Sequence, residues 1–398
     1  TWMTLATSAA VLTSAFGSVV PALAQATITP EQALDRLFSA DQVNPDWFTP
    51  SFLAQVPASQ IQVILSQETA SLGAYQSVQK TANGYVVSFA KGTLLVKAIV
   101  LDDRGRFSTL LLGNPQFQNS AGALDQALSQ LQALPGQVSL LILKNGQQMM
   151  TINAGMPLAV GSTFKLAVLT ALRRQIDAGR RNWADVVALD PAWKSLPSGI
   201  LQDWPDGSPL TLQTLASLMI SISDNTAANS LIQIAGRDAV DAVAPARDRP
   251  FLTTREAFVL KDPANSDLHD QYLNGGMSGR LAALQAADSR PLPGADVFAN
   301  GTGAPEVEWF FTVGELCDLM NQVADLPLMG IDPGVTDPNE WTRIAFKGGG
   351  ETGVLNLTHG LQNSAGDRYC VSATWNNTVA LDDNRFSALV GQILSTLG

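Results

Sequence analysis

Residues 161–165 read GSTFK and place Ser162 and Lys165 three positions apart at the expected start of a helix. A strand-like stretch ends at Val160, and apolar residues recur at helical spacing after Lys165. Side chains at i and i+3 share one face of a helix, so the lysine amine can reach the serine hydroxyl. A partly buried lysine loses its charge readily and can then accept the serine proton. The alternative is an N-capping Ser162 followed by a solvated Lys165.

A second polar motif, Ser223-Asp224-Asn225, interrupts an apolar helical pattern within the stretch MISISDNTAANSLI. A helix that breaks for three polar residues and then resumes is expected to bend and to present these side chains to a cleft. The alternative is a turn between two helices, capped by the serine or the aspartate.

A third motif, Lys347-Gly348-Gly349-Gly350, lies on the first of three strand-like stretches near the end of the sequence. Glycines near a strand edge allow a ligand to approach the backbone closely, and the lysine offers a positive charge to an anionic group. The alternative is a β-bulge or a kink with a solvated lysine.

Taken together, GSTFK, SDN and KGG resemble the motifs of the penicillin-recognising serine enzymes, most closely class A β-lactamases, and occur in the same order. The separation of the first two motifs, 223 − 162 = 61 residues, is also similar. The resemblance covers about residues 121–398. It implies an α+β fold in which helices flank an antiparallel sheet and an all-helical subdomain is inserted, as in β-lactamases and transpeptidases.

The resemblance also implies the roles of the catalytic residues. Ser162 is expected to be the acylated nucleophile and Lys165 its general base. Ser223 is expected to relay a proton to the leaving group. Lys347 is expected to steady both Ser223 and a substrate carboxylate.

Substrate binding is assigned by the same resemblance to Asn225, Gly349 and Gly350. The backbone N–H groups of Ser162 and Gly350 are expected to form an oxyanion hole, aimed at the charge that appears in the tetrahedral state. Gly348 departs from the family pattern, which has threonine or serine after the lysine, so one hydroxyl contact to a substrate carboxylate is lost.

Deacylation in class A enzymes uses a glutamate and an asparagine four residues apart. The corresponding stretch, FLTTREAFVLKDPAN, offers Glu256 but has Leu260 in place of the asparagine. Glu256 is a candidate to orient a water molecule. The alternative is an ion pair with Arg255 or another surface cation. The sequence therefore predicts acylation followed by slow deacylation.

An additional domain is predicted before the hydrolase domain. Residues 28–72 show helical patterns, and residues 73–112 read as short strands separated by turn signals, which indicates a small α+β domain over 28–112. Residues 113–120 are predicted to be a linker. This organisation is similar to the two-domain β-lactamase-like proteins of clavulanic acid biosynthesis clusters, a resemblance that implies esterase activity.

The first 24 residues predict export. They carry no charge, and their apolar run ends in the small-x-small pattern Ala22-Leu23-Ala24, as in a signal peptide; the alternative is an uncleaved anchor. Charged residues make up 15% of the sequence, against roughly 25% in average soluble domains. We expect a secreted or periplasmic protein, with no membrane association beyond an N-terminal anchor.

Other classes of function are disfavoured. A net charge of −11 argues against nucleic-acid binding. The two histidines, His269 and His359, are expected to be structural, and the absence of an HExxH motif or a His/Cys cluster predicts neither metal nor cofactor. Cys317 and Cys370 fit a disulfide in an oxidising compartment and two separate core residues equally well.

The leading hypothesis is a monomeric serine hydrolase, acting on a β-lactam, an ester or a related small acyl compound. The rival is a non-hydrolytic penicillin-binding-like module that senses or binds its ligand. A third possibility is a peptidase that acts on cell-wall D-alanine peptides.

Overall fold

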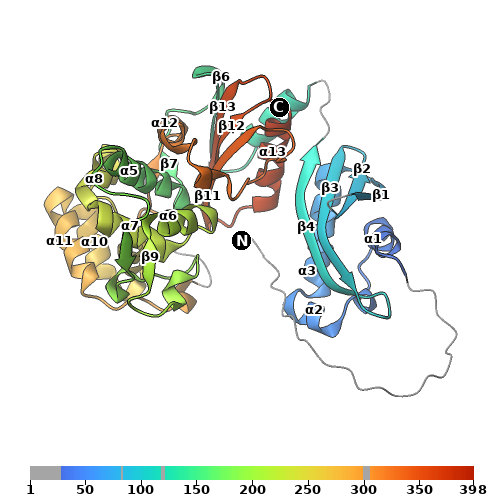
Figure 1. The fold of residues 1–398 in the computed structure, drawn as a ribbon, viewed down its shortest axis with the longest axis horizontal. Coiled ribbons are helices and arrows are strands. Elements are labelled where there is room, and N and C mark those ends of the chain that lie inside the picture. The colour runs from blue at the N-terminus through green and yellow to red at the C-terminus, as the bar shows by residue number, and fades with distance from the viewer. Residues whose placement is uncertain (1–27, 82–83, 118–121, 299–304) are drawn as a thin grey trace. The chain divides into compact units, whose positions relative to one another are not determined.

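The computed structural model describes residues 28–81, 84–117, 122–298 and 305–398 (Figure 1). The signal peptide predicted for residues 1–24 lies outside these residues. The chain divides into two compact units. The first runs to Leu124 and includes Ser387–Leu397, and the second comprises Asp125–Phe386 and Gly398.

The first unit combines helices with a four-stranded antiparallel sheet. Its helices are α1 (Pro30–Ser39), α2 (Pro50–Gln55) and α3 (Ala58–Leu72). Its strands, in sheet order, are β1 (Tyr75–Thr81), β2 (Gly84–Phe89), β3 (Gly92–Leu101) and β4 (Phe107–Phe117). Thr29 caps α1 in a capping box, which sets where the first helix begins. Leu34, Phe89 and Phe107 are fully buried between the helices and the sheet, as the alternating patterns predict.

Strand β4 corrects the predicted linker. Residues 113–117 continue the strand, and only residues 118–120 of the predicted linker fall outside the described part of the chain. Pro115 pairs with Leu94 of β3. Proline is tolerated here because β4 lies at the edge of its sheet, where a missing backbone N–H breaks no ladder on the outer side.

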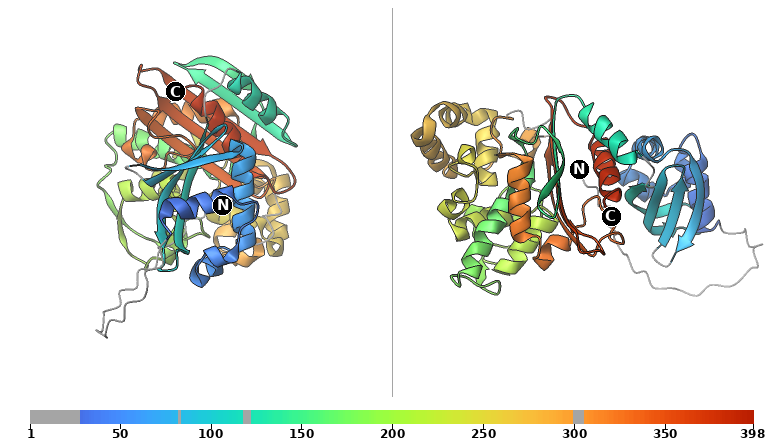
Figure 2. Two further views of the ribbon diagram at one scale, coloured as in Figure 1. Left: turned by 90° about the vertical axis from the view of Figure 1, so that its right-hand side faces the viewer. Right: turned by 90° about the horizontal axis from the view of Figure 1, so that it is seen from above.

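The second unit is built on a five-stranded antiparallel sheet with the order β11-β12-β13-β5-β6. The hairpin β5 (Gln137–Lys144) and β6 (Gln147–Ile152) comes first in the sequence, and β11 (Arg343–Glu351), β12 (Val354–Gln362) and β13 (Arg368–Asn376) come last. Between them lies a mostly helical segment, which Figure 2 shows as a layer on one side of the sheet. Two short strands, β7 (Leu158–Ala159) and β10 (Phe310–Phe311), pair with each other.

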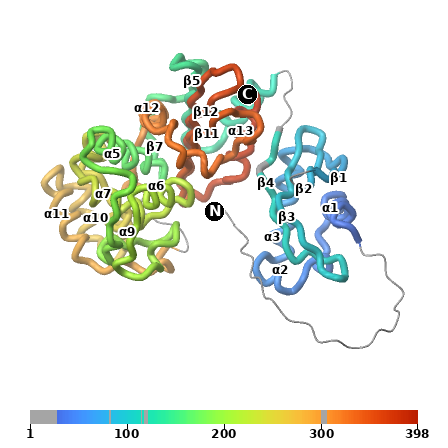
Figure 3. Tube along the Cα trace, viewed as in Figure 1, coloured from blue at the N-terminus to red at the C-terminus, as the bar shows by residue number. Residues whose placement is uncertain are grey.

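The helices of this unit can be followed along the trace in Figure 3. They are α4 (Ala123–Gln132), α5 (Lys165–Asp177), α6 (Leu212–Ser221), α7 (Asn225–Ala235), α8 (Arg237–Asp241), α9 (Thr254–Lys261), α10 (Ser266–Asn274), α11 (Gly276–Asp288) and α12 (Val313–Val323). Helix α13 (Asp383–Ser395) begins in this unit, and its residues from Ser387 onward belong to the first unit. Helix α12 packs on the sheet, and α5 packs against α12 and α7. A disulfide between Cys317 and Cys370 joins α12 to β13, which answers the question the sequence left open.

The register of the sheet determines on which face of the sheet Lys347 lies. Lys347 pairs with Thr358, and Thr358 pairs with Ser372. Paired residues share a face, as do residues two apart, so Lys347 lies on the same face as Cys370 and therefore faces the helical layer. The predicted fold class, an antiparallel sheet flanked by helices and preceded by a small α+β domain, is confirmed. Within the described residues, no helix has the length and hydropathy needed to cross a bilayer.

Candidate active site

Ser162 lies in a short 3₁₀ turn (Gly161–Phe164) that leads directly into α5. The sequence predicts this serine at the start of the long helix, and the structure inserts one tighter turn before it. Gly161 has φ of +50°, and a Cβ at this position would lie 2.9 Å from the backbone nitrogen of Gly350. Glycine is therefore required both by the backbone conformation and by the close approach of β11.

Lys165 is fully buried at the centre of a polar cluster. Its Nζ donates to the carbonyl oxygen of Ser223 at 2.6 Å and to Oδ1 of Asn225 at 2.7 Å, and it lies 3.1 Å from Oγ of Ser162. Burial, followed by the positive charge of Lys347, lowers the pKa of Lys165 well below its ordinary value. A neutral amine has two hydrogens and one lone pair. In the neutral form the two oxygen acceptors can take both hydrogens, and the lone pair is then available to the Ser162 hydroxyl.

Ser223 connects the two buried lysines. Its Oγ lies 3.2 Å from Nζ of Lys165 and accepts a hydrogen bond from Nζ of Lys347 at 3.0 Å. Lys347 also donates to the carbonyl oxygen of Gly348. Burial lowers the pKa of Lys347 to about 8, although the negative charge of Asp332 opposes this shift. Ser223 has φ of +58°, a conformation that non-glycine residues adopt at an energetic cost and that is common at functional sites.

Asp224 holds this bend in place and caps the helix that follows, as the alternative interpretation of the SDN motif predicted. Its Oδ1 accepts from the backbone N–H of Ala227, which makes it the N-cap of α7. Its Oδ2 accepts from the backbone N–H groups of Ile200 and Leu201 at 2.7 and 3.0 Å. The capping preference of aspartate is the sequence signal behind that alternative, but the contact with Ile200 depends on the folded chain.

The glycines after Lys347 are explained by the distance between β11 and the 3₁₀ turn. A Cβ on Gly349 would lie 2.2 Å from the carbonyl oxygen of Val160 and 2.6 Å from the backbone nitrogen of Ser162. These are backbone atoms that cannot move aside. The structure therefore brings Ser162, Lys165, Ser223, Asn225 and Lys347 together, with Gly349 and Gly350 against the serine turn.

Comparison with known proteins shows similarity to one family of enzymes. The sequence model described as the Beta-lactamase enzyme family matches residues 122–268, which include the GSTFK and SDN motifs. Residues 122–268 are therefore similar to β-lactamase-like serine enzymes. Among curated proteins, β-lactamase VEB-1 of Pseudomonas aeruginosa is 24% identical over 183 residues, a match that spans 45% of this chain and 60% of that protein.

Solved structures of similar proteins cover most of the β-lactamase-like domain. A β-lactamase from Sphaerobacter thermophilus DSM 20745 is 25% identical and covers 69% of this chain and 95% of its own, with a TM-score of 0.47. PBP-A is 17% identical and covers 72% of this chain and 97% of its own, with a TM-score of 0.45.

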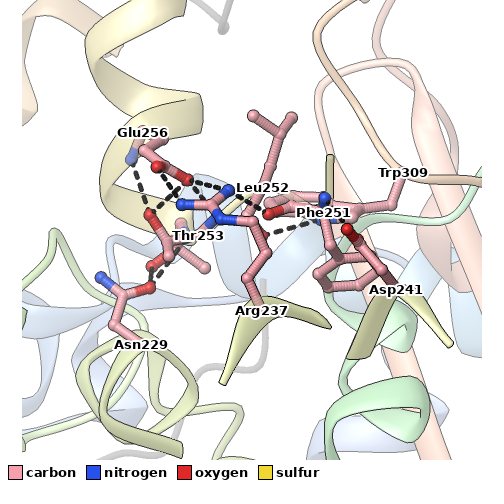
Figure 4. A network of polar contacts seen from close by, with 9 residues as sticks. Asn229, Arg237, Asp241, Phe251, Leu252, Thr253, Glu256 and Trp309 are labelled. Atoms are coloured by element: carbon pink, nitrogen blue, oxygen red, sulfur yellow. Dashed lines mark hydrogen bonds and ion pairs between the residues drawn. The ribbon is translucent and has the colours of Figure 1, made fainter. Parts of the chain in front are cut away.

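Glu256, the predicted water-orienting residue, is engaged in an ion pair and in a helix cap. Its carboxylate is fully buried and accepts from Arg237 through Nη2 at 2.5 Å and Nη1 at 3.1 Å (Figure 4). It also accepts from the backbone N–H and the hydroxyl of Thr253, completing the capping box of α9. The ion pair that the sequence left as the alternative thus forms, with Arg237 rather than Arg255 as the partner.

The residue of α9 that reaches the motif residues is Thr254, which the sequence analysis did not single out. Its Oγ1 lies 2.8 Å from Oδ1 of Asn229, 2.8 Å from Oγ of Ser195 and 3.3 Å from the carbonyl oxygen of Asn225. A threonine hydroxyl can position neighbours, but it cannot act as a carboxylate base. No local sequence pattern marks Thr254, because its partners are more than 20 residues away.

The two histidines, His269 and His359, lie on different elements of the second unit. His359 is buried on β12 against the ring of Phe346, and burial lowers its pKa to about 3. His269 lies on α10, with Nε2 at 2.9 Å from Oε1 of Glu306. Over the described ranges, no group of three or more His, Cys, Asp or Glu residues is arranged to hold a metal ion.

Substituting Glu256 with glutamine is expected to affect stability rather than acyl release. The change removes the carboxylate that is hydrogen-bonded to the partly buried Arg237 guanidinium, which should lower the free energy of unfolding by roughly 1–3 kcal/mol. Urea denaturation measures this loss, and the decay of the acyl adduct by intact mass measures release. A folded variant that releases the acyl group more slowly than the wild type would instead make Glu256 part of the deacylation machinery.

Proposed function

We propose that this protein is a serine hydrolase that forms an acyl-enzyme at Ser162. The observation that carries this proposal is the fully buried Lys165, whose Nζ lies 3.1 Å from Oγ of Ser162 and also contacts the carbonyl oxygen of Ser223 and Oδ1 of Asn225. Oγ attacks the carbonyl carbon of the substrate while its proton passes to Nζ. The resulting oxyanion accepts hydrogen bonds from the backbone N–H groups of Ser162 and Gly350.

Collapse of the tetrahedral intermediate breaks the bond to the leaving group. We assign Ser223 to deliver the proton, because its Oγ lies within 3.2 Å of Lys165 Nζ, which holds the proton taken from Ser162. Lys347 donates a hydrogen bond to the same Oγ, which makes the Ser223 hydroxyl a better proton donor to the leaving group. The products of this half-reaction are the Ser162 ester and the protonated leaving group.

The charges around Lys347 favour a neutral substrate. Its ammonium group already donates hydrogen bonds to Ser223 and to the carbonyl oxygen of Gly348. The negative charge of Asp332 also offsets part of its positive charge. Gly348 has no hydroxyl to help bind a substrate carboxylate. We therefore expect neutral esters to be better small-molecule substrates of this site than β-lactams that carry a carboxylate.

Release of the acyl group is proposed to be slow. Glu256 is paired with Arg237, and the residue of α9 that contacts Asn225 is Thr254, which has no carboxylate. This arrangement supports the second candidate function, a penicillin-binding-like module that is acylated once and not turned over. The disulfide between Cys317 and Cys370 supports the proposal of a secreted or periplasmic location, since disulfides persist in oxidising compartments.

Intact mass spectrometry with a penicillin and an activated neutral ester tests this function. We expect an adduct on the wild type, formed faster with the ester, and no adduct on Ser162→Ala. A persistent adduct without product accumulation would favour the binding module over the hydrolase. Product formation that survives in Ser162→Ala would refute the assignment of Ser162.

A further inference from the structure

A second buried charge cluster lies beside the proposed oxyanion hole. Nζ of Lys261, at the end of α9, lies 2.6 Å from Oε1 of Glu308 and 2.8 Å from both carboxylate oxygens of Glu351. The side chains of Lys261 and Glu308 are 2% and 1% exposed, and that of Glu351 is 17% exposed. Burying three ionisable groups is costly, and the catalytic steps proposed above use none of them.

Glu308 is connected to the turn that carries the nucleophile. The next residue, Trp309, accepts a hydrogen bond through its carbonyl oxygen from the backbone N–H of Val160 at 3.0 Å. The ring of Trp309 stacks on Phe164 with ring centroids 3.9 Å apart. Val160 and Phe164 flank Ser162, so the segment that carries Glu308 contacts both ends of the serine turn.

Glu351 is connected to Gly350, which supplies the other backbone N–H of the proposed oxyanion hole. It follows Gly350 on β11 and forms the last pair of the ladder with Val354 of β12. Its position is therefore tied to that of the Gly350 backbone N–H. Lys261 bridges the two glutamates, and so links the segment behind Ser162 to the strand that carries Gly350.

We propose that Lys261, Glu308 and Glu351 form a clamp that sets the spacing between the backbone N–H groups of Ser162 and Gly350. This inference rests on the proposed function, because it assigns those two groups to the oxyanion hole. The three residues are positioning residues, since they act through the backbone and do not touch the substrate. A donor must lie within about 2.7–3.1 Å of the oxyanion, so a small change in spacing weakens catalysis.

The charge state of the clamp suits this role. Burial raises the pKa of Glu308 to about 8, and the pKa of Lys261 is raised by its two carboxylate partners against the opposing effect of burial. A glutamate that takes up a proton more readily reduces the negative charge beside an oxyanion that forms during the reaction.

Lys261→Met tests the clamp through the acyl-enzyme itself. The infrared carbonyl stretch of the Ser162 ester should move to higher wavenumber, because the carbonyl loses hydrogen bonding in the hole. The acylation rate constant should fall about 10- to 100-fold, less than the roughly 10²–10³-fold cost of deleting a donor outright. The dissociation constant of the non-covalent complex should not change.

Arg237→Met is the matched control, because it breaks another ion pair anchored on α9 and leaves the clamp intact. It should destabilise the protein without moving the carbonyl stretch. A second variant, Lys261→Met with Glu308→Gln and Glu351→Gln, removes the bridge without leaving an unpaired buried charge, which protects against misfolding. This triple variant should show the same shift of the carbonyl stretch as Lys261→Met.

An unchanged carbonyl stretch in the folded triple variant would overturn the clamp, as would an equal shift in Arg237→Met. The two proposals fail in different ways. Absence of any Ser162 adduct on the wild type would refute the proposed function and the clamp with it. A wild-type adduct whose stretch is insensitive to Lys261 would refute the clamp alone.

Discussion

Replacing Lys165 with methionine is expected to reduce the acylation rate constant by about 10²–10⁴-fold, the range usual for loss of a general base. Methionine fills much of the same buried volume but cannot accept the Ser162 proton. Because a fully buried lysine is unfavourable for folding, the variant should be at least as stable as the wild type. Stopped-flow acylation by an activated ester and thermal denaturation measure the two effects.

The pH dependence of the wild type provides an internal check on this prediction. Acylation requires Lys165 to be neutral and Lys347 to be charged. The rate should therefore fall at low pH, as Lys165 takes up a proton, and fall again above about pH 8, as Lys347 loses its charge. In Lys165→Met the acylation rate should no longer show this decrease at low pH, the acid limb of the profile. If the variant keeps both the wild-type rate and the acid limb, Lys165 is not the base.

Replacing Gly349 with alanine is expected to reduce acylation by about 10²–10³-fold, the cost of losing an oxyanion-hole donor. The new Cβ would collide with backbone atoms of Val160 and Ser162 at 2.2 and 2.6 Å. The serine turn and β11 must then separate, which pulls apart the N–H groups of Ser162 and Gly350. Single-turnover kinetics measure the loss, and circular dichroism confirms that the sheet survives.

Gly350→Ala serves as the comparison. Its Cβ would meet a methyl group of Leu355 at 3.3 Å and the carbonyl oxygen of Val354 at 3.4 Å, so the neighbours need to move only slightly. It keeps the backbone N–H and should lose much less activity than Gly349→Ala. Equal losses in the two variants would show that the close approach at Gly349 is not what controls the rate.

Much of the fold and of the candidate site could be predicted without the tertiary structure. Turn residues and period-2 or helical patterns identified the strand hairpin, the helical segment and the three late strands, because these signals are local. The order and spacing of GSTFK, SDN and KGG singled out the residues that lie together in the structure. The edge strand continuing through Pro115 was missed, because a proline-containing polar stretch reads as a linker when its neighbours are unknown.

The partners of the buried charges were decided only by the tertiary structure. A glutamate in TTREAF looks the same in sequence whether it orients water or pairs with Arg237, which lies 19 residues earlier. Lys261, Glu308 and Glu351 belong to three distant segments, and no local pattern connects them. Sequence by itself determined which residue types were available and which elements carry them. Whether a buried lysine is suited to be a base, as proposed for Lys165, or a bridge, as proposed for Lys261, depends on the charges that folding places around it.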